Sequence, residues 1–383
     1  MPFGWKGAPA AFQSTMDTLL QRGIHDGFIT VYMDDILVHS RNMDDHINHL
    51  GWVFDTLSKA YFRLNPEKCL FALSEVEFLG HKISSKGVFP KEDKLDSIAN
   101  LKQPKNLREL RGLLGTLGFY QTFVPNFATL ARPMSKLLSA KQEFRWGPEQ
   151  DAALSSIKRA FASINPLSLI DPENTKGFVL ITDASANAIG AQLLRVNNNN
   201  DQLLVMNVSR ALSPTEQRYS NTERELLSVV WALNRLELIM CGKRVDIYTD
   251  HAALIPILLG SVKRVSTPRV ERLRLKLSRF IPYGLTIQHV PGKLNTADTL
   301  SRPGHLARLY SDMDNPNRTS LRGGEGATLS PILKQHGDLL TQKIARNLGS
   351  LQSTAHTQKG TWSWIILIGH LVQRKIKTLP QST

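Results

Sequence analysis

The sequence of 383 residues contains only two cysteines, Cys69 and Cys241. Two cysteines cannot form a disulfide framework or a cysteine-rich zinc site, and their scarcity is typical of a reducing compartment. The longest apolar run, WIILIGHLV at 364–372, is too short to span a bilayer. The N-terminal MPFGWKGAPA also lacks the basic and apolar regions of a signal peptide. These absences predict an intracellular protein, cytoplasmic or nuclear, that has no membrane partner.

Several common site motifs are absent as well. The sequence has no GxxxxGK loop for phosphates, no zinc-binding pattern of cysteines and histidines, and no Asp-Thr-Gly triplet. These absences argue against a P-loop nucleotide site, a zinc-stabilised module and an aspartic protease. The candidate chemistry must therefore come from acidic side chains elsewhere in the chain.

The charge of the chain is strongly positive. Lysine and arginine number 47 against 33 acidic residues, which gives a formal net charge of +14 and a pI near 9.8. Such a balance favours a polyanionic partner, nucleic acid ahead of a membrane surface, although a merely basic soluble protein would share it. The length predicts two or three domains, because one hydrophobic core rarely serves so many residues.

One short stretch, VYMDDILVHS at 31–40, places two carboxylates between apolar runs. The pattern predicts a tight β-hairpin with Asp34 and Asp35 at or beside its turn. Paired carboxylates on rigid strands can hold Mg²⁺ for two-metal phosphoryl chemistry. The tripeptide alone is weak evidence, because NMDDH at 42–46 repeats it where a helix is predicted to begin.

The rest of the chain divides by pattern. Residues from about 91 to 145 are helical and basic, and VEFLGHKIS before them reads as one short strand reaching a glycine. From about 146 to 302 the order β-β-β-α-β-α-α-β predicts a mixed sheet covered by helices. Residues 303–383 are polar and lack a clear period, which predicts a largely disordered tail with a possible helix or strand near 362–375.

Four acids fall on predicted strand ends and helix starts in the 146–302 segment. They could converge over one sheet edge and hold two metal ions: Asp183, Glu225, Asp250 and Asp298. Glu223, two positions away, competes with Glu225 for the helix position.

Each of these acids also has a purely structural interpretation. Asp183 could form a turn, and Glu225 could be the capping-box partner of Thr222. Asp250 could cap a helix that begins near His251, and Asp298 could be an ordinary acid at a helix start. The interpretations stay open from the residues alone.

Several ordered segments resemble reverse transcriptases of gypsy-type LTR retrotransposons and their retroviral relatives. The resemblance runs from residue 1 to about 302. Its segments are MPFGWKGAPAAFQ, VYMDDILVHS, LNPEKCLFALSEVEFLGHKIS, LRELRGLLGTLGFYQTFVPNFATLARPMSKLL, TDAS, YSNTERELLSVVWAL, YTDH and HVPGKLNTADTLSR. The implied fold class is α+β and α/β multidomain, with a partial palm at 1–90, a helical thumb and connection at 91–145, an RNase H-like mixed sheet with flanking helices at 146–302, and the tail at 303–383.

The resemblance also has departures. The family's polymerase site uses a third aspartate on a strand before the Pro-Phe-Gly segment, and here that segment begins at Met1. We therefore expect an N-terminally truncated palm in which Asp34 and Asp35 are two thirds of a metal site. Many relatives have a mobile histidine after a Val-Pro pair, where this chain has Gly292 and Lys293, and His289 on the preceding strand is expected to be structural.

The resemblance implies metal-dependent cleavage of RNA in RNA/DNA hybrids, with Mg²⁺, or alternatively Mn²⁺, held by the four acids. An alternative is a catalytically inactive nucleic-acid-binding remnant. A third is that a separate chain supplies the missing part of the polymerase. No oligomeric state is predicted.

A basic cluster surrounds a predicted helix before the last strand. Its members are Lys263, Arg264, Arg269, Arg272, Arg274, Lys276 and Arg279. Such a row could contact duplex phosphates with salt-dependent, sequence-independent affinity. The solvated face of an amphipathic helix would give the same pattern.

Overall fold

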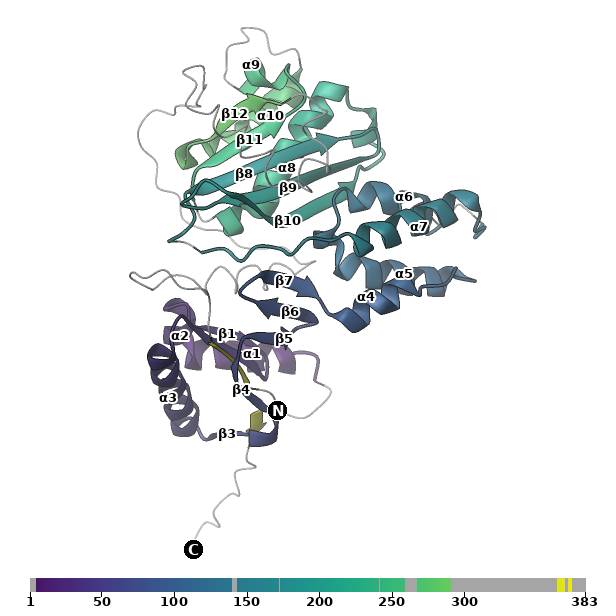
Figure 1. Ribbon diagram of the computed structural model, residues 1–383. Coiled ribbons are helices and arrows are strands. Elements are labelled where there is room, and N and C mark those ends of the chain that lie inside the picture. The colour runs from purple at the N-terminus through teal and green to yellow at the C-terminus, as the bar shows by residue number, and fades with distance from the viewer. Residues whose placement is uncertain are drawn as a thin grey trace, which may run out of the picture. The chain divides into compact units, whose positions relative to one another are not determined.

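The computed structural model describes residues 5–139, 143–171, 173–240, 242–258, 267–290, 364–368 and 371–373 (Figure 1). These residues form two compact units. The first contains the described residues up to Phe89, a short segment at 169–173, and the two C-terminal strands. The second contains the described residues from Pro90 to Val290 apart from that segment. The predicted domain boundary near 145 lies inside the second unit, and the boundaries remain predictions.

The first unit is built from three helices and several short strands. Its elements are α1 (Ala8–Leu19), α2 (Gln21–His25), β1 (Ile29–Tyr32), β2 (Asp35–Ser40), α3 (Met43–Lys59), β3 (Phe62–Leu64), β4 (Cys69–Leu73), β5 (Glu75–Phe78), β6 (His81–Ser84) and β7 (Gly87–Pro90). Asn42 begins α3 by accepting a hydrogen bond from the Asp45 N–H at 2.8 Å, and Asp44 and Asp45 complement the helix dipole there. Apolar residues of α1, β1, β2 and α3 form the core, including Met16, Ile29, Ile36 and Val53.

The predicted hairpin at 31–40 is confirmed. Strands β1 and β2 pair antiparallel, with Tyr32 opposite Asp35. The prediction of one strand over VEFLGHKIS was wrong, because β5 and β6 form a hairpin that turns at Leu79 and Gly80. Both turn residues have positive φ, of 48° and 80°, a backbone conformation that glycine adopts without strain.

The four-stranded sheet of the first unit includes a strand from the far end of the sequence. Its order is β1-β2-β13-β4, and β13 (Trp364–Ile368) pairs antiparallel with β2 and β4. A second strand, β14 (Leu371–Gln373), pairs with β3. Both strands are yellow in Figure 1. Of the helix or strand expected near 362–375, the structure has strands, while most of 303–383 lies outside the described residues.

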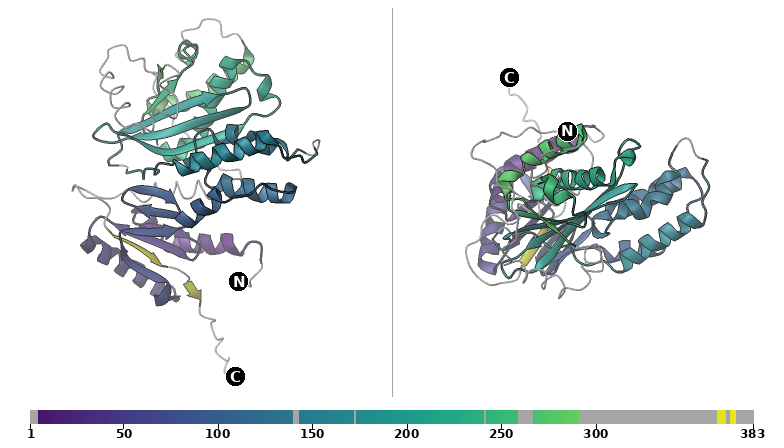
Figure 2. Two further views of the ribbon diagram at one scale, coloured as in Figure 1. Left: turned by 45° about the vertical axis from the view of Figure 1, so that its right-hand side comes forward. Right: turned by 90° about the horizontal axis from the view of Figure 1, so that it is seen from above.

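The second unit combines helices with a five-stranded sheet (Figure 2). Its helices are α4 (Glu92–Ala99), α5 (Leu107–Phe119), α6 (Phe127–Lys136), α7 (Pro148–Ala162), α8 (Asn221–Met240), α9 (Leu254–Leu258) and α10 (Pro268–Ser278). Its strands are β8 (Gly177–Ala184), β9 (Ala188–Val196), β10 (Gln202–Ala211), β11 (Val245–Thr249) and β12 (Thr286–His289).

The order of the second sheet, β10-β9-β8-β11-β12, makes it mixed, as predicted. Strands β8, β9 and β10 pair antiparallel, whereas β11 runs parallel to both β8 and β12. Helix α8 packs against β8 and β9, and α10 packs against α8. The parallel pair matters for function, because the C-terminal ends of β8 and β11 meet at one edge of the sheet. Within the described residues, no helix is both long and apolar enough to cross a membrane.

We predict that β13 holds the first sheet together by pairing with the flanks of both β2 and β4. Replacing Ile366 by proline removes a backbone donor from a central strand, which a ladder does not tolerate. Amide hydrogen exchange of β2 and β4 should then accelerate by about tenfold or more. The control, Ile366→Val, keeps the donor and a β-branched side chain and should preserve protection. Equal protection in both variants would show that the strand is dispensable.

Candidate carboxylate site

Asp183 lies near the C-terminal end of β8, the strand predicted for it, and not in a turn. It stands opposite Gly190 of β9 in the antiparallel register. Its carboxylate Oδ2 accepts a hydrogen bond from Asn126 Nδ2 at 3.2 Å. Burial raises the pKa of Asp183, and the negative charge of Asp250 raises it further, while hydrogen bonds from the Ala184 backbone and Asn126 oppose this.

Glu225 is buried in the second turn of α8. The residue is only 4% exposed. Its Oε2 atom is buried and has no hydrogen-bond partner among the described residues. Burial raises the pKa of Glu225 to about 8, and the charges of Asp250 and Asp183 act in the same direction. A buried carboxylate in this state is a strong candidate for binding a cation or a proton.

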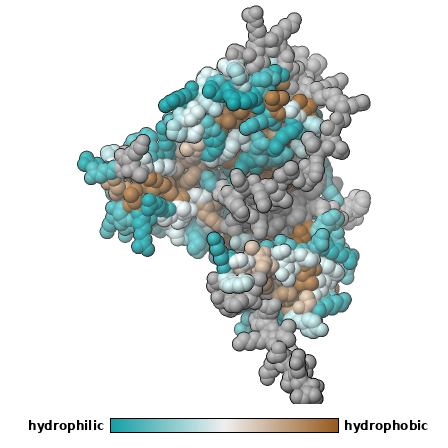
Figure 3. Space-filling model, turned by 180° about the vertical axis from the view of Figure 1, so that it is seen from behind, coloured by the Kyte–Doolittle hydropathy of each residue, from teal (hydrophilic) through white to brown (hydrophobic). Residues whose placement is uncertain are grey.

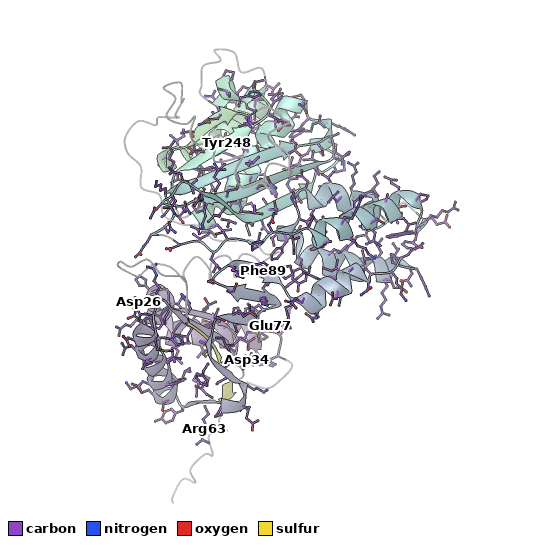
Figure 4. The ribbon with its side chains drawn as sticks, in the orientation of Figure 1. Asp26, Asp34, Arg63, Glu77, Phe89 and Tyr248 are labelled. Atoms are coloured by element: carbon purple, nitrogen blue, oxygen red, sulfur yellow. The ribbon has the colours of Figure 1, made fainter. Side chains whose placement is uncertain are left out.

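Asp250 follows β11 directly and reaches the same sheet edge as Asp183. Its backbone carbonyl is hydrogen-bonded to His289 Nε2 at 3.1 Å, and the Val290 N–H donates to the Thr249 carbonyl at 2.9 Å. His289 thus holds the backbone beside Asp250, in keeping with the structural role expected of it. Tyr248, labelled in Figure 4, marks the strand that leads to this position.

The two structural alternatives for Glu225 and Asp250 do not hold. The capping box of α8 is formed by Ser220 and Glu223, since the Ser220 N–H donates to Glu223 Oε2 at 2.9 Å and the Glu223 N–H donates to Ser220 Oγ at 3.3 Å. Helix α9 begins at Leu254, four residues after Asp250 and not near His251.

Glu223, the rival of Glu225, is engaged away from the other acids. It accepts hydrogen bonds from Thr267 Oγ1 at 3.2 Å and from Arg269 at 3.1 Å. Burial works to raise the pKa of Glu223, but these donors and the Ser220 N–H outweigh it, so the pKa is lowered. The structure therefore separates the two glutamates by their partners, and it is Glu225 whose charge interacts with Asp183 and Asp250.

A divalent cation fits the chemistry of this site. Carboxylate oxygens are the hard ligands that Mg²⁺ prefers, and Glu225 Oε2 is buried without a hydrogen bond. Within the ranges that the structure describes, however, no three acidic, histidine or cysteine side chains are grouped closely enough to hold one ion. The fourth predicted acid, Asp298, lies outside the described residues. The three described carboxylates thus interact through their charges, and an ion would need to draw them closer.

Asp34 and Asp35 lie at the β1–β2 turn in the first unit, where Asp34 is labelled in Figure 4. The turn is fixed by Gln13 of α1, a residue that the sequence did not single out. Gln13 Oε1 accepts from the Met33 N–H at 2.7 Å, and its Nε2 donates to the Val31 carbonyl at 3.2 Å. Met33 has a positive φ of 53°, which this side-chain contact supports.

The described part of the predicted basic cluster is largely paired within the protein. Arg269 contacts Glu223 and lies over the Tyr219 ring at 4.1 Å, and Arg274 pairs with Glu271 at 3.3 Å. Three further contacts are from Arg272 Nε to the Pro268 carbonyl at 3.3 Å, from Arg279 to Glu237, and from Arg279 to the Phe280 ring at 4.7 Å. Lys263 and Arg264 lie outside the described residues. The duplex-binding role of the whole cluster, Lys276 included, remains a prediction.

Two glycines of α5, Gly115 and Gly118, face open space. A Cβ added at Gly115 or Gly118 would meet no described atom within 4 Å, so helix packing does not require these glycines. The face of the molecule in Figure 3 shows mainly hydrophilic residues with small hydrophobic patches between them.

Comparison with known protein families gives two matches. Residues 1–83 match the family described as reverse transcriptase (RNA-dependent DNA polymerase). Residues 173–280 match the family described as the RNase H-like domain found in reverse transcriptase. The second range contains Asp183, Glu225 and Asp250, and the first contains Asp34 and Asp35.

Two polyproteins of transposons are among the similar curated proteins. The retrovirus-related Pol polyprotein from transposon 412 of Drosophila melanogaster is 36% identical over 303 residues, which cover 79% of this chain and 24% of that protein. The transposon Tf2-3 polyprotein of Schizosaccharomyces pombe is 33% identical over 305 residues, covering 79% of this chain and 22% of that one. The chain thus spans about a quarter of the length of these relatives.

Solved structures of foamy viral protease-reverse transcriptase share the fold. The complex with double-stranded DNA has a TM-score of 0.63 at 24% identity, covering 76% of this chain and 60% of that one. The complex with an RNA/DNA hybrid has a TM-score of 0.62 at 23% identity, covering 88% and 42%. Together with the family matches, this likeness leads to one conclusion: the chain carries a reverse transcriptase segment and an RNase H-like domain of the kind found in retrotransposon Pol polyproteins.

Proposed function

We propose that this chain is a metal-dependent endonuclease that cuts the RNA strand of RNA/DNA hybrids, within a gypsy-type retrotransposon lineage. The observation that carries the proposal is the charge interaction of Asp183 and Asp250, at the ends of β8 and β11, with Glu225 of α8, which is buried and has its pKa raised to about 8. Glu225 is buried while Asp183 and Asp250 are exposed, and a cation beside them would relieve the repulsion between their negative charges.

The ligands of that partner would be Asp183, Glu225, Asp250 and Asp298, with Mg²⁺ or Mn²⁺ as the ion. When bound, a pair of such ions lowers the pKa of water and neutralises the charge of a scissile phosphate. The chain's own contribution is to hold the carboxylates on rigid elements. The hydrogen bond from Asn126 fixes one side of Asp183, and the pairing of β11 with β12 fixes the backbone at Asp250. Hydrolysis would leave a 3′-hydroxyl and a 5′-phosphate.

The substrate class is supported by charge and by likeness. The net charge of +14 favours a polyanion. The similar foamy viral structures are complexes with double-stranded DNA and with an RNA/DNA hybrid. Because phosphate contacts dominate such binding, affinity should fall as salt rises.

We propose no polymerase activity for the 383 residues by themselves. Asp34 and Asp35 come from a single turn, and the 364–368 strand beside β2 contains no acid. A two-metal site needs carboxylates from more than one side. The rival to the nuclease proposal is a silent hybrid-binding protein, which the absence of a close ligand trio among the described residues favours.

The direct test is cleavage of an end-labelled RNA/DNA hybrid by the purified chain. Cutting should require Mg²⁺ or Mn²⁺, stop with EDTA, and fall more than about a hundredfold in Asp183→Asn, which loses a ligand charge. Asp55→Asn, an exposed acid of α3 in the other unit, is the matched control and should cut normally.

The same preparation should not extend a primer on an RNA template. Binding of the hybrid without any cutting would establish the silent alternative. Primer extension lost in Asp34→Asn would instead show that the first unit is a working polymerase.

Stability should depend on pH through Glu225. The pKa of Glu225 is about 8 in the folded state, above its ordinary value of 4.5. Below pH 4.5 the group is protonated in both the folded and unfolded states, whereas above pH 8 ionising it in the folded state lowers the free energy of unfolding. In EDTA, the unfolding free energy should therefore fall across this window by a few kcal/mol, an order-of-magnitude figure from the size of the shift. Glu225→Gln should remove most of this dependence and stabilise the protein at pH 8 and above.

The matched variant Glu223→Gln should behave in the opposite sense. Its pKa is lowered by Ser220, Thr267 and Arg269, so its contribution is present above the ordinary pKa and lost as pH falls. The variant should be destabilised at neutral pH. Urea unfolding of both variants between pH 4 and 9 checks the pair, and similar curves for the two would contradict the assignment.

A further inference from the structure

A short segment from the helical part of the second unit crosses the sheet at the carboxylate site. Asp183, Gly190 and Ser209 lie side by side in one row across β8, β9 and β10, as the strand registers show. Asn126 and Ala128 contact the two ends of this row. Asn126 Nδ2 donates to Asp183 Oδ2 at 3.2 Å, and the Ala128 N–H donates to Ser209 Oγ at 2.9 Å.

Gly190 lies in the middle of this row, opposite Asp183, where a side chain would collide with Asn126. A Cβ at Gly190 would lie 2.3 Å from Asn126 Oδ1, far inside contact distance. Only a residue without a side chain lets the Asn126 amide come so close to the sheet. The position of Asn126 and the identity of residue 190 are therefore linked.

Asn126 has an unusual, left-handed backbone conformation. Its φ of 49° and ψ of 32° are left-handed, a region in which asparagine is enriched among residues other than glycine. Asn126 precedes α6, but its side chain makes no capping hydrogen bond to that helix. Its amide binds Asp183 instead, 57 residues further along the chain.

The segment is anchored on its other side as well. Asn207 Nδ2, which is buried, donates to the Thr122 carbonyl at 2.9 Å. Residues 122–128 are thus attached to β10 at both ends, with Asn126 between the attachments. The side chain is held in place by the sheet that carries the carboxylate.

We propose that Asn126 is a positioning residue for Asp183, so that the connection helices set the metal affinity of the nuclease site. The amide restricts rotation of the carboxylate and donates to its charged form. The proposal rests on the nuclease function proposed above and assigns part of that function to a residue outside the RNase H-like match at 173–280.

Asn126→Gly is the decisive variant, because glycine keeps the left-handed backbone and removes only the amide. Its cleavage should need about tenfold more Mg²⁺ for half-maximal rate, as expected when a supporting hydrogen bond to a ligand is lost. Hybrid affinity at fixed salt should stay unchanged.

Two further variants separate positioning from mere stability. Gly190→Ala should reproduce the Mg²⁺ effect of Asn126→Gly, because its Cβ displaces the Asn126 side chain. Thr116→Ala removes an exposed hydrogen bond within α5, from Thr116 Oγ1 to the Gly112 carbonyl, and should leave the Mg²⁺ requirement unchanged. A wild-type Mg²⁺ requirement in Asn126→Gly, or an equal shift in Thr116→Ala, would overturn the proposal.

A readout without nucleic acid distinguishes failure of this inference from failure of the nuclease proposal. Mn²⁺ should raise the melting temperature of the wild-type chain, and Asn126→Gly should need about tenfold more Mn²⁺ for the same rise. If the wild-type chain binds Mn²⁺ but cuts nothing, the nuclease proposal fails while this comparison still decides the role of Asn126. If Mn²⁺ produces no rise in the wild-type chain, the positioning role is overturned.

Discussion

The candidate site of the second unit depends on electrostatic repulsion among three carboxylates, since the charge of Asp250 raises the pKa of both Asp183 and Glu225. Parallel pairing of β8 with β11 brings their C-terminal ends to one edge, and α8 places Glu225 against them. Both strands are held in the hydrophobic core, because they carry fully buried apolar side chains such as Val179, Leu180 and Ile247. Hydrophobic burial of these elements offsets the cost of holding the charges close. The result is a cluster of negative charge at one edge of the sheet, in which Glu225 is buried and Asp183 and Asp250 are exposed.

The sequence predicted the parts of this arrangement that local patterns encode. The order of strands and helices from 177 to 289 and the hairpin at 31–40 followed from alternation, helical spacing and turn residues. The preference for Glu225 over Glu223 had little local support, since both lie in the first turns of one helix. Their separation comes from tertiary partners: Arg269 and Thr267 reach Glu223 from more than 40 residues away.

Asn126 could not be found in this way at all. Its functional contact spans 57 residues, and an asparagine before a helix is ordinarily interpreted as a cap. Gly190 gave no signal either, because a glycine within a strand has several structural explanations. Only the register that aligns Asp183, Gly190 and Ser209 shows what the two residues do together. The basic helix shows the opposite limit of sequence analysis. Several of its arginines were predicted to bind nucleic acid, but they form ion pairs with acidic residues of the same unit.

The two acidic sites differ in a way that bears on which chemistry the chain supports. In the second unit the carboxylates come from the ends of two strands and from a helix, although the described side chains are not grouped closely enough to hold one ion. In the first unit Asp34 and Asp35 are neighbours on one turn, and the strand beside β2, Trp364–Ile368, is wholly apolar in sequence. That strand pairs its backbone with β2 and β4, but it brings no carboxylate to the sheet. Since a two-metal site must surround its ions, the proposed nuclease chemistry needs carboxylates from several elements, which the second unit supplies and the β1–β2 turn by itself does not.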